Sequence, residues 1–455
     1  MPQISARDLA LMVLRAVEEK DAYANLALNQ LLERHRLEKV ERAFATQLTY
    51  GVLRTRNTLD WILSHFTKKP LKSQTILLRN ILRLGVYQLL YMDKVPPSAA
   101  CNEGAEMARR YGHQGAVKFV NGVLRNVARR GGEIGFPSIE EDPVKHIVLR
   151  YSHPQWIVKD WLDSFGQEET LAICMANNEA APTTIRTNTL RLTRDELKER
   201  LCREGVTVRE TAFASEGLVI DDYFSIDRIN AFKEGLFQVQ DESSMLAGRA
   251  LCPDIGAKVL DACSAPGGKT THLAELMGNK GEILAADPYP HKISLIEDNC
   301  RRLGIEIVRT MAADASRLTD DLEEWADYAL VDAPCTGLGV LRRRPDARWR
   351  KEESQPVTIA ELQRSILDGV SRCLKPGGVL VYSTCTITHQ ENLGQVKDFL
   401  NRHREFYLES LSPYLPSELE STGRGSLSSG YFQILPGIYG MDGFFICRMR
   451  KKSGH

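Results

Sequence analysis

The chain has 455 residues, which is enough for about three domains of ordinary size. Its composition, 43% hydrophobic and 26% charged, is that of a globular protein, and no apolar run reaches the ~18 residues that span a bilayer. The first twenty residues carry charges throughout and lack the apolar core of a signal peptide, so we expect a cytoplasmic protein with no membrane partner.

The formal net charge is zero, but it is unevenly distributed. Residues 1–150 hold 23 Lys and Arg against 15 Asp and Glu. A basic first third indicates a polyanionic partner such as a nucleic acid, although a merely solvated basic surface would give the same count. The ten cysteines include no C-x-x-C pair, which argues against a zinc site of the usual spacing, and we expect no metal.

Residues 1–135 are predicted to form an all-α domain. Ser5 and Asp8 have the spacing of a capping box, and apolar residues follow at helical intervals. The segment 115–130 places valines on one helix face and basic side chains on the rest. We interpret Lys118 and Arg125 as RNA contacts, with a solvated polar face as the alternative.

Residues 146–245 are predicted to form a small α+β module after a linker rich in Gly, Pro and acids at 131–143. "TTIRTNTL", "VTVRET" and "GLVI" are typical of strands, and "TRDELKERLCREG" of a helix capped by Thr193 and Glu196. The module lacks an aromatic RNA-stacking pattern, so the sequence leaves its role open.

Residues 246–455 alternate strands and helices, which predicts a parallel, doubly wound, Rossmann-like α/β domain. Ligands bind at the carboxyl ends of the strands in such sheets. Polar residues lie at the end of each of the five predicted strands. In chain order they are Asp261 and Cys263 for the first strand, Asp287 for the second, Asp314 for the third, Asp332 and Cys335 for the fourth, and Ser383, Thr384 and Cys385 for the fifth. This concentration of carboxylates and thiols indicates a site.

The turn after the first of these strands is predicted to bind a cofactor. It consists of Cys263, Ser264, Ala265, Pro266, Gly267, Gly268 and Lys269. A phosphate-binding loop would need glycine at position 263, and Pro266 offers a phosphate no N–H. Asp287, about 20 residues further on, suits the two hydroxyls of a ribose, and Asp314 suits an adenine amino group. A nucleoside without a phosphate chain fits best, and S-adenosylmethionine is the common one.

Four motifs carry a resemblance to a known family. "DACSAPGGKT", "DAPCTGLG" with "RRRPDARW" after it, "YSTCT" and "GMDGFF" resemble, in this order, the NOL/NOP/Sun family of RNA cytosine-5 methyltransferases. The likeness runs from about residue 150 to the end, and "FVNGVLRN" with the helical first third resembles a NusB-like RNA-binding domain. The resemblance implies S-adenosylmethionine-dependent methylation of carbon 5 of a cytosine in 16S ribosomal RNA, by a monomer, through a covalent Cys–cytosine intermediate.

Two cysteines compete for the role of nucleophile. The reaction needs a thiolate that adds to carbon 6 of the base, and residue types alone leave Cys335 and Cys385 open. Pro334-Cys335 resembles the Pro-Cys pair that supplies the nucleophile in DNA cytosine methyltransferases. The resemblance to the RNA family instead implies that Cys385 attacks, that Cys335 assists product release and that Asp332 contacts the polar edge of the cytosine and also borders the cofactor.

A basic segment follows the Pro-Cys turn. We interpret Arg342, Arg343, Arg344, Arg348 and Trp349 as contacts to RNA phosphates and to an extruded base, with a solvated surface loop as the alternative.

Two other functions compete with the methyltransferase. A non-catalytic RNA-binding or ribosome-assembly factor would have no need of both cysteines with Asp332, and a nucleotide-hydrolysing enzyme is disfavoured by Cys263 and Pro266.

Overall fold

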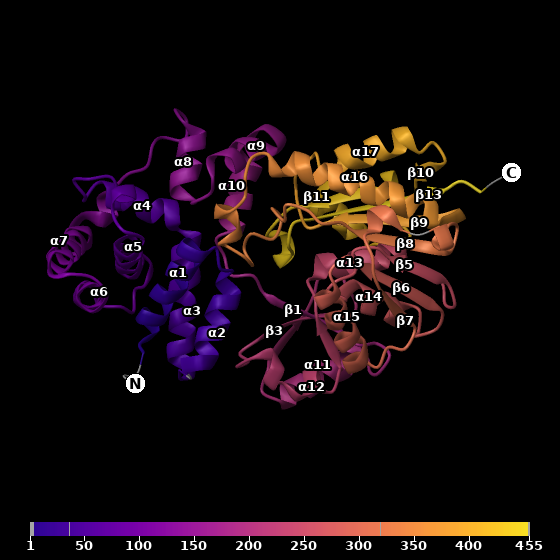
Figure 1. Cartoon of the computed structure of the whole chain (residues 1–455), viewed down its shortest axis with the longest axis horizontal. Helices are drawn as coiled ribbons and strands as arrows, with labels where there is room; N and C mark the ends of the chain where they lie inside the picture. Colours follow the sequence, from indigo (N-terminus) through magenta and orange to yellow (C-terminus); the bar gives the residue numbers. More distant parts are fainter. Residues whose placement is uncertain (1–3, 36, 319, 454–455) are drawn as a thin grey trace. The chain divides into compact units, whose positions relative to one another are not determined.

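The computed structural model describes residues 4–35, 37–318 and 320–453. The chain folds as two compact units, which Figure 1 traces in sequence colours. The first unit contains the residues up to Ala180 together with Leu341–Lys351, and the second contains Ala181–Val340 with the residues from Glu352 onward. Across the described ranges, no helix is both long and apolar enough to cross a membrane.

The first unit is all-helical and includes the predicted α domain. Ser5 and Asp8 form the expected capping box of the first helix. The central helix, α5, buries most of its length because it is apolar on nearly every side. The helices are α1 (Ala6–Lys20), α2 (Ala24–His35), α3 (Lys39–Arg54), α4 (Arg56–Ser64), α5 (Ile76–Tyr91), α6 (Pro97–Tyr111), α7 (Gln114–Arg130), α8 (Pro143–Arg150), α9 (Gln155–Phe165) and α10 (Gln167–Ala176).

Helix α7 presents the two faces that its sequence predicts. Val120, Val123 and Val127 are buried in the core of the unit, whereas Lys118 and Arg125 are exposed. The valines recur at helical spacing, so one stripe packs inward and the basic side chains remain in solvent. The basic face of α7 is thus available to a ligand.

Of the predicted α+β module, 146–245, only the part from Ala181 onward forms the start of the second unit, and the residues up to Ala180 belong to the helical first unit. Its four strands pair antiparallel in the order β2-β3-β1-β4, and the capping box of Thr193 and Glu196 begins α11 as expected. Apolar residues of α11 and the strands make a small core of their own. The elements are β1 (Thr183–Thr187), α11 (Arg194–Arg203), β2 (Thr207–Glu210), β3 (Gly217–Asp221), α12 (Asn230–Lys233) and β4 (Phe237–Val239).

The rest of the second unit is built on a nine-stranded sheet, which confirms the predicted Rossmann-like fold. Strands β7, β6, β5, β8 and β9 run parallel in that spatial order, and an antiparallel group continues the sheet beyond β9. The chain moves from β5 outward to β7 and then crosses to β8 on the other side of β5. The switch in strand order therefore lies between β5 and β8, where such folds bind ligands.

Helices pack on both faces of this sheet. Alternate residues of each strand enter opposite cores: Leu330 of β8 packs on one side, and Ala329 and Val331 on the other. Figure 1 shows α14 and α15 on one face and α16 and α17 on the other. The elements are α13 (Glu242–Leu251), β5 (Lys258–Asp261), α14 (Gly268–Leu276), β6 (Glu282–Asp287), α15 (Pro290–Leu303), β7 (Val308–Ala312), β8 (Ala326–Asp332), α16 (Gln355–Cys373), β9 (Leu374–Thr384), α17 (Leu393–Arg402), β10 (Phe406–Leu408), β11 (Gly423–Ser426), β12 (Tyr431–Ile434) and β13 (Phe444–Lys451).

The small module is tied to the sheet domain by a buried ion pair. Arg186 of β1 is fully buried, and its guanidinium donates to both carboxylate oxygens of Glu275 in α14 at 2.8 Å. The same guanidinium donates to the carbonyl oxygen of Gly268 at 2.7 Å. Gly268 belongs to the predicted cofactor turn. The module therefore braces that turn through one side chain.

We expect Arg186→Ala to lower the free energy of unfolding of the full chain by roughly 3–5 kcal/mol, because Glu275 would keep a buried charge without its partner. Arg203→Ala, which removes an exposed arginine from α11 of the same module, should change the free energy by less than about 0.5 kcal/mol. Urea unfolding followed by circular dichroism measures both. Equal stability of the two variants would contradict the bracing role.

Candidate active site

The pairing of two parallel strands assembles the centre of the site. In β8 and β9, Asp332 lies directly beside Ser383. Because the strands run in the same direction, the segments that leave them begin at the same edge of the sheet. Cys335 follows Asp332 by three residues and Cys385 follows Ser383 by two, so the pairing brings the two thiols to one place.

Asp332 is held on both carboxylate oxygens. Lys269 of the glycine turn contacts Oδ2 with its Nζ at 2.7 Å, and the hydroxyl of Ser383 donates to Oδ1 at 2.9 Å. The ammonium of Lys269 also lies 5.1 Å from the ring centroid of Phe444, which belongs to the "GMDGFF" motif. Three of the four sequence motifs that carry the family resemblance therefore converge on one carboxylate, and the fourth supplies the ring.

The sulfur atoms of Cys335 and Cys385 lie 3.4 Å apart. A hydrogen bond from Cys335 lowers the pKa of Cys385; burial and the negative charges of Asp332 and Asp442 oppose this, and the positive charge of Lys269 supports it. The pKa of Cys335 is raised by that same hydrogen bond, then by burial and by the negative charges of Glu391 and Asp332. The environment thus favours a thiolate on Cys385 and a proton on Cys335.

A close approach of two backbones shapes the wall beside the thiols. The N–H of Gly339 donates to the carbonyl oxygen of Cys385 at 3.0 Å, and the N–H of Gly443 donates to that of Gly339 at 2.9 Å. A side chain on Gly339 would collide with the carbonyl oxygen of Gly443. Gly339 of "CTGLG" and Gly443 of "GMDGFF" are therefore required by packing against each other.

The turn from Cys263 to Lys269 lies at the topological switch, between the ends of β5 and β8. Gly267 adopts a φ of +97°, and a Cβ there would lie 3.1 Å from Cα of Ile296, whereas a Cβ on Gly268 would meet no atom within 4 Å. Open space above Gly268 leaves room for a ligand against the backbone. Cys263 is half-buried against the core and burial raises its pKa, in keeping with a small packed side chain.

The carboxylates at the strand ends fit a nucleoside cofactor. Asp261 is fully buried; Thr270 donates to its Oδ2 at 2.7 Å, and its Oδ1 has no hydrogen-bond partner within the described part of the chain. Burial raises the pKa of Asp261 to about 7. Asp287, at the end of β6, accepts from the N–H of Tyr289, and Asp314 caps a short helical turn through Ser316. The unpaired oxygen of Asp261 is a further group that a cofactor's amino or hydroxyl group could satisfy.

The predicted RNA-contacting arginines do not share one environment. Arg348 is fully buried within the first unit and donates to the carbonyl oxygens of Ser152 at 3.0 Å and Asn177 at 2.9 Å. It also donates to the side-chain oxygen of Asn178 at 2.8 Å and to the carbonyl oxygen of Arg54 at 3.5 Å. Burial lowers the pKa of Arg348 to about 9, so it keeps its charge at neutral pH. We therefore leave Arg348 out of the candidate RNA surface.

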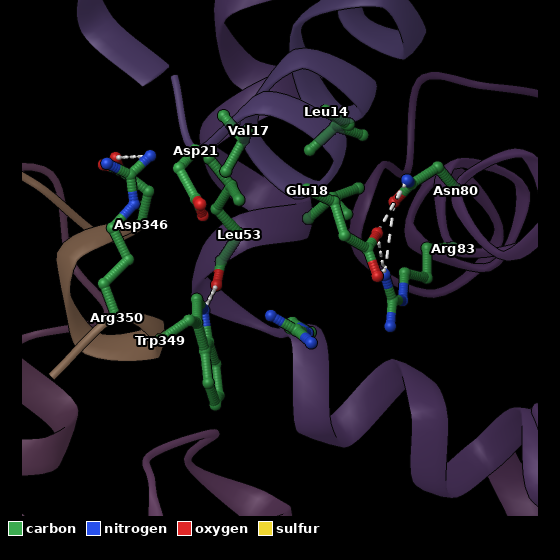
Figure 2. A pocket seen from close by; sticks show the side chains of 12 residues that line it. Leu14, Val17, Glu18, Asp21, Leu53, Asn80, Arg83, Asp346, Trp349 and Arg350 are labelled. Carbon is green, nitrogen blue, oxygen red and sulfur yellow. Dashed lines mark hydrogen bonds and ion pairs between the residues drawn. The ribbon is translucent and has the colours of Figure 1, made fainter. Parts of the chain in front are cut away.

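The rest of this segment divides in the same way. Arg342 is buried, Arg343 is half-buried and Arg344 is exposed. The indole N–H of Trp349 donates to the carbonyl oxygen of Leu53 at 2.8 Å. Figure 2 shows Trp349 and Arg350 on one side of a cavity of about 180 Å³ in the first unit, opposite Glu18 and Arg83. Of the five predicted contacts, Arg344 is the one whose side chain is exposed.

Sequence reasoning missed several members of the site. The sequence indicates Ser383 only as a strand end and Lys269 only as part of the cofactor turn, and it gives no signal for Glu391. The pairing of Asp332 with Lys269 joins residues 63 positions apart, for which a single sequence gives no signal. The described residues contain no cluster of His, Cys, Asp and Glu that could hold a metal ion.

We expect Cys335→Ala to raise the pKa of Cys385, because the substitution removes the hydrogen bond that stabilises the thiolate. The midpoint of the pH dependence of Cys385 alkylation by iodoacetamide should move upward by roughly one pH unit. Peptide mass spectrometry resolves the individual cysteines. Cys202→Ala removes an exposed thiol and should leave the midpoint unchanged. The same midpoint in both variants would count against the hydrogen bond.

Arg348→Ala should lower the free energy of unfolding by roughly 3 kcal/mol, because buried carbonyl oxygens would lose a charged donor and a cavity would form. Arg344→Ala, four residues earlier and exposed, should change it by less than about 0.5 kcal/mol. Denaturant midpoints of the full-length chain measure the difference. If Arg348→Ala is as stable as the unsubstituted protein, Arg348 has no structural role and again becomes a candidate RNA contact.

Comparison with known proteins places the chain in a family. Residues 249–450 match 16S rRNA methyltransferase RsmB/F, residues 4–129 match the NusB family and residues 153–227 match the ferredoxin-like domain of RsmF/B-like methyltransferases. The chain is 40% identical, over the full length of both, to the probable ribosomal RNA small subunit methyltransferase B of Bacillus subtilis. It is 31% identical to the ribosomal RNA small subunit methyltransferase B of Cronobacter sakazakii over 99% of each chain.

Two solved structures share the fold over long stretches. The crystal structure of PH0851 superposes with a TM-score of 0.80 at 28% identity, covering 98% of this chain and 99% of that one. NSun6 from Pyrococcus horikoshii, solved with SFG, gives a TM-score of 0.60 at 26% identity and covers 66% of this chain and 99% of its own. With a full-length relative at 40% identity, the chain belongs to the RsmB/F family of 16S rRNA methyltransferases.

Proposed function

We propose that this protein methylates carbon 5 of a cytosine in 16S ribosomal RNA, with S-adenosylmethionine as the methyl donor and Cys385 as the nucleophile. The observation that carries the proposal is the pair of thiols 3.4 Å apart beside a carboxylate held by Lys269 and Ser383. Carbon 5 of cytosine is a poor nucleophile. A thiolate that adds to carbon 6 turns the ring into an enamine, in which carbon 5 can accept a methyl group.

Cys385 is the better candidate for the attacking thiolate. The hydrogen bond from Cys335 lowers the pKa of Cys385, and the positive charge of Lys269 adds to this, although burial, Asp332 and Asp442 oppose it; the pKa of Cys335 is raised by the same hydrogen bond, by burial and by Glu391 and Asp332. Asp332, oriented on both oxygens, is placed to contact the amino and ring-nitrogen edge of the cytosine. Lys269 and Ser383 keep this carboxylate fixed during the attack, so little reorganisation is needed.

The glycine turn and the strand-end carboxylates form the cofactor site in this proposal. The open space at Gly268 allows close approach of the cofactor to the backbone, Asp287 takes the ribose hydroxyls and Asp314 the adenine amino group. When bound, S-adenosylmethionine supplies an electrophilic methyl group on its sulfonium. Its site at the ends of β5 and β6 adjoins the thiols at the ends of β8 and β9, because β5 and β8 are neighbours.

Cys335 completes the cycle. After methylation, a base takes the proton from carbon 5, the electrons of that bond re-form the double bond to carbon 6, and the bond from carbon 6 to the sulfur of Cys385 breaks with its electron pair on sulfur, which restores the aromatic ring and the thiolate. The sulfur of Cys335 is 3.4 Å from that of Cys385 and therefore close to the bond that breaks. We assign it to this release step.

The RNA side of the proposal rests on exposed basic residues. Lys118 and Arg125 project from α7, and Arg344 is exposed in the segment after the Pro-Cys turn. Lysine and arginine side chains suit the phosphate backbone, which carries most of the affinity of such complexes. The target base must leave its stack to reach a thiol between strand ends.

The decisive experiment traps the covalent enzyme–RNA adduct on a denaturing gel. Full-length Cys335→Ala and Cys385→Ala proteins are incubated with 16S rRNA and S-adenosylmethionine. We expect Cys335→Ala to accumulate adduct, because attack proceeds and release stalls, and Cys385→Ala to form none. Methyl incorporation at carbon 5, read by bisulfite sequencing, checks the product.

The reverse pattern, with adduct only in Cys385→Ala, would assign the attack to Cys335. Absence of both adduct and methylated cytosine with the unsubstituted protein would point to a non-catalytic RNA-binding factor on the same fold.

A further inference from the structure

A buried glutamate that the proposed mechanism does not use lies behind the two cysteine loops. Glu391 is fully buried, six residues after Cys385, in the segment between β9 and α17. Burying a carboxylate is costly unless its oxygens receive hydrogen bonds. The groups that contact this side chain show what it does.

Each oxygen of Glu391 accepts from the loop that carries Cys335. The backbone N–H of Thr336, the residue after Cys335, donates to Oε2 at 2.7 Å, and the hydroxyl of Thr336 donates to Oε1 at 2.5 Å. Gln363 of α16 contacts Oε2 at 3.4 Å and also donates to the carbonyl oxygen of Pro334 at 2.9 Å. The carboxylate and Gln363 thus hold the backbone on both sides of Cys335.

The same carboxylate reaches the loop that carries Cys385. The hydroxyl of Thr388 donates to Oε1 at 2.7 Å, and the hydroxyls of Thr336 and Thr386 lie 2.8 Å apart. The backbone of Glu391 is itself fixed, because the hydroxyl of Tyr382 in β9 donates to its carbonyl oxygen at 2.6 Å. One side chain therefore joins the two cysteine loops through four donors, none of which is a cation.

We propose that Glu391 is a positioning residue that keeps the sulfur of Cys335 close to that of Cys385 for the release of the product. It touches neither thiol and acts through the Thr336 backbone. Cys385 is the residue directly after β9, and the pairing of β9 with β8 and β13 holds that strand end without Glu391. Loss of Glu391 should therefore displace Cys335 more than Cys385. The inference rests on the proposed function, in which Cys335 releases the product.

Loss of the Glu391 side chain should therefore slow the release of the product but not the attack by Cys385. In Glu391→Ala, the buried donors of Thr336 and Thr388 lose their acceptor, and the Cys335 loop shifts toward other partners. Attack by Cys385 continues, while release slows by about tenfold or more, because small displacements of a reacting group have effects of this size. Glu391→Gln keeps an oxygen for the Thr336 N–H, and the two hydroxyls can turn to accept from its amide nitrogen.

The test uses the full-length protein with 16S rRNA and S-adenosylmethionine. The adduct fraction on a denaturing gel is compared for Glu391→Ala, Glu391→Gln and Cys335→Ala. Thr336→Val and Thr388→Val form a matched pair, each removing one hydroxyl from the same carboxylate on a different loop. We expect adduct to accumulate in Glu391→Ala and, to a smaller extent, in Thr336→Val. Glu391→Gln and Thr388→Val should stay near the unsubstituted protein.

A second readout does not depend on turnover. The rate at which iodoacetamide alkylates Cys335, relative to Cys385, should rise at least about threefold in Glu391→Ala over Glu391→Gln, because the loosened loop exposes the thiol. Binding of S-adenosylhomocysteine, measured by calorimetry, should be unchanged in both variants.

The outcomes separate the two proposals. If Cys335→Ala accumulates adduct but Glu391→Ala turns over normally, Glu391 has no positioning role and the proposed function stands. Loss of S-adenosylhomocysteine binding in Glu391→Ala would make the residue a general structural support and overturn the inference. If Cys335→Ala forms no adduct, the role of Cys335 in release fails, and the alkylation ratio alone then decides whether Glu391 positions it.

Discussion

The site depends on the parallel pairing of β8 with β9, in which Asp332 lies beside Ser383. A parallel pair delivers the ends of both strands to one edge of the sheet, so the segments that follow must share the same small space. Cys335 and Cys385 reach each other for this reason. A slip of one residue between the strands would turn Asp332 away from Ser383 and into a different face of the sheet. The apolar residues that precede Asp332 and Ser383 are buried in the cores on both faces and fix this register.

Within that arrangement, the two cysteines differ because of their neighbours rather than their residue type. Asp332 disfavours a negative charge on either sulfur; Lys269, which reaches across from the glycine turn, counteracts this at Cys385, whereas Glu391 adds to it at Cys335. A single hydrogen bond between the sulfurs then acts in opposite directions on the two groups. Glu391 contributes geometry as well as charge, since it receives four donors from the loop that carries Cys335, the loop that carries Cys385 and α16.

The segment after the Pro-Cys turn shows that a run of arginines need not be a ligand surface. Leu341–Lys351 belongs to the helical unit, and Arg348 provides the hydrogen bonds that hold it there. A guanidinium with several directed donors can satisfy backbone carbonyl oxygens that no apolar side chain could. Arg344, in the same run, remains in solvent. Burial therefore separates two side chains that composition treats alike.

The sequence by itself determined the fold class, the succession of strands and helices along the chain and the capping boxes at Ser5 and Thr193, because these follow from short-range periodicity and local hydrogen bonds. It also placed Asp287, Asp332, Cys335 and Cys385 at strand ends, since chemistry-bearing residues after apolar runs are visible in one dimension. The contacts of Asp332 with Lys269, of Glu391 with Thr336 and of Arg348 with Ser152 were decided only by the tertiary structure. Each joins residues separated by 55 to 196 positions, and such pairs are set by strand order and packing, about which local sequence carries no information.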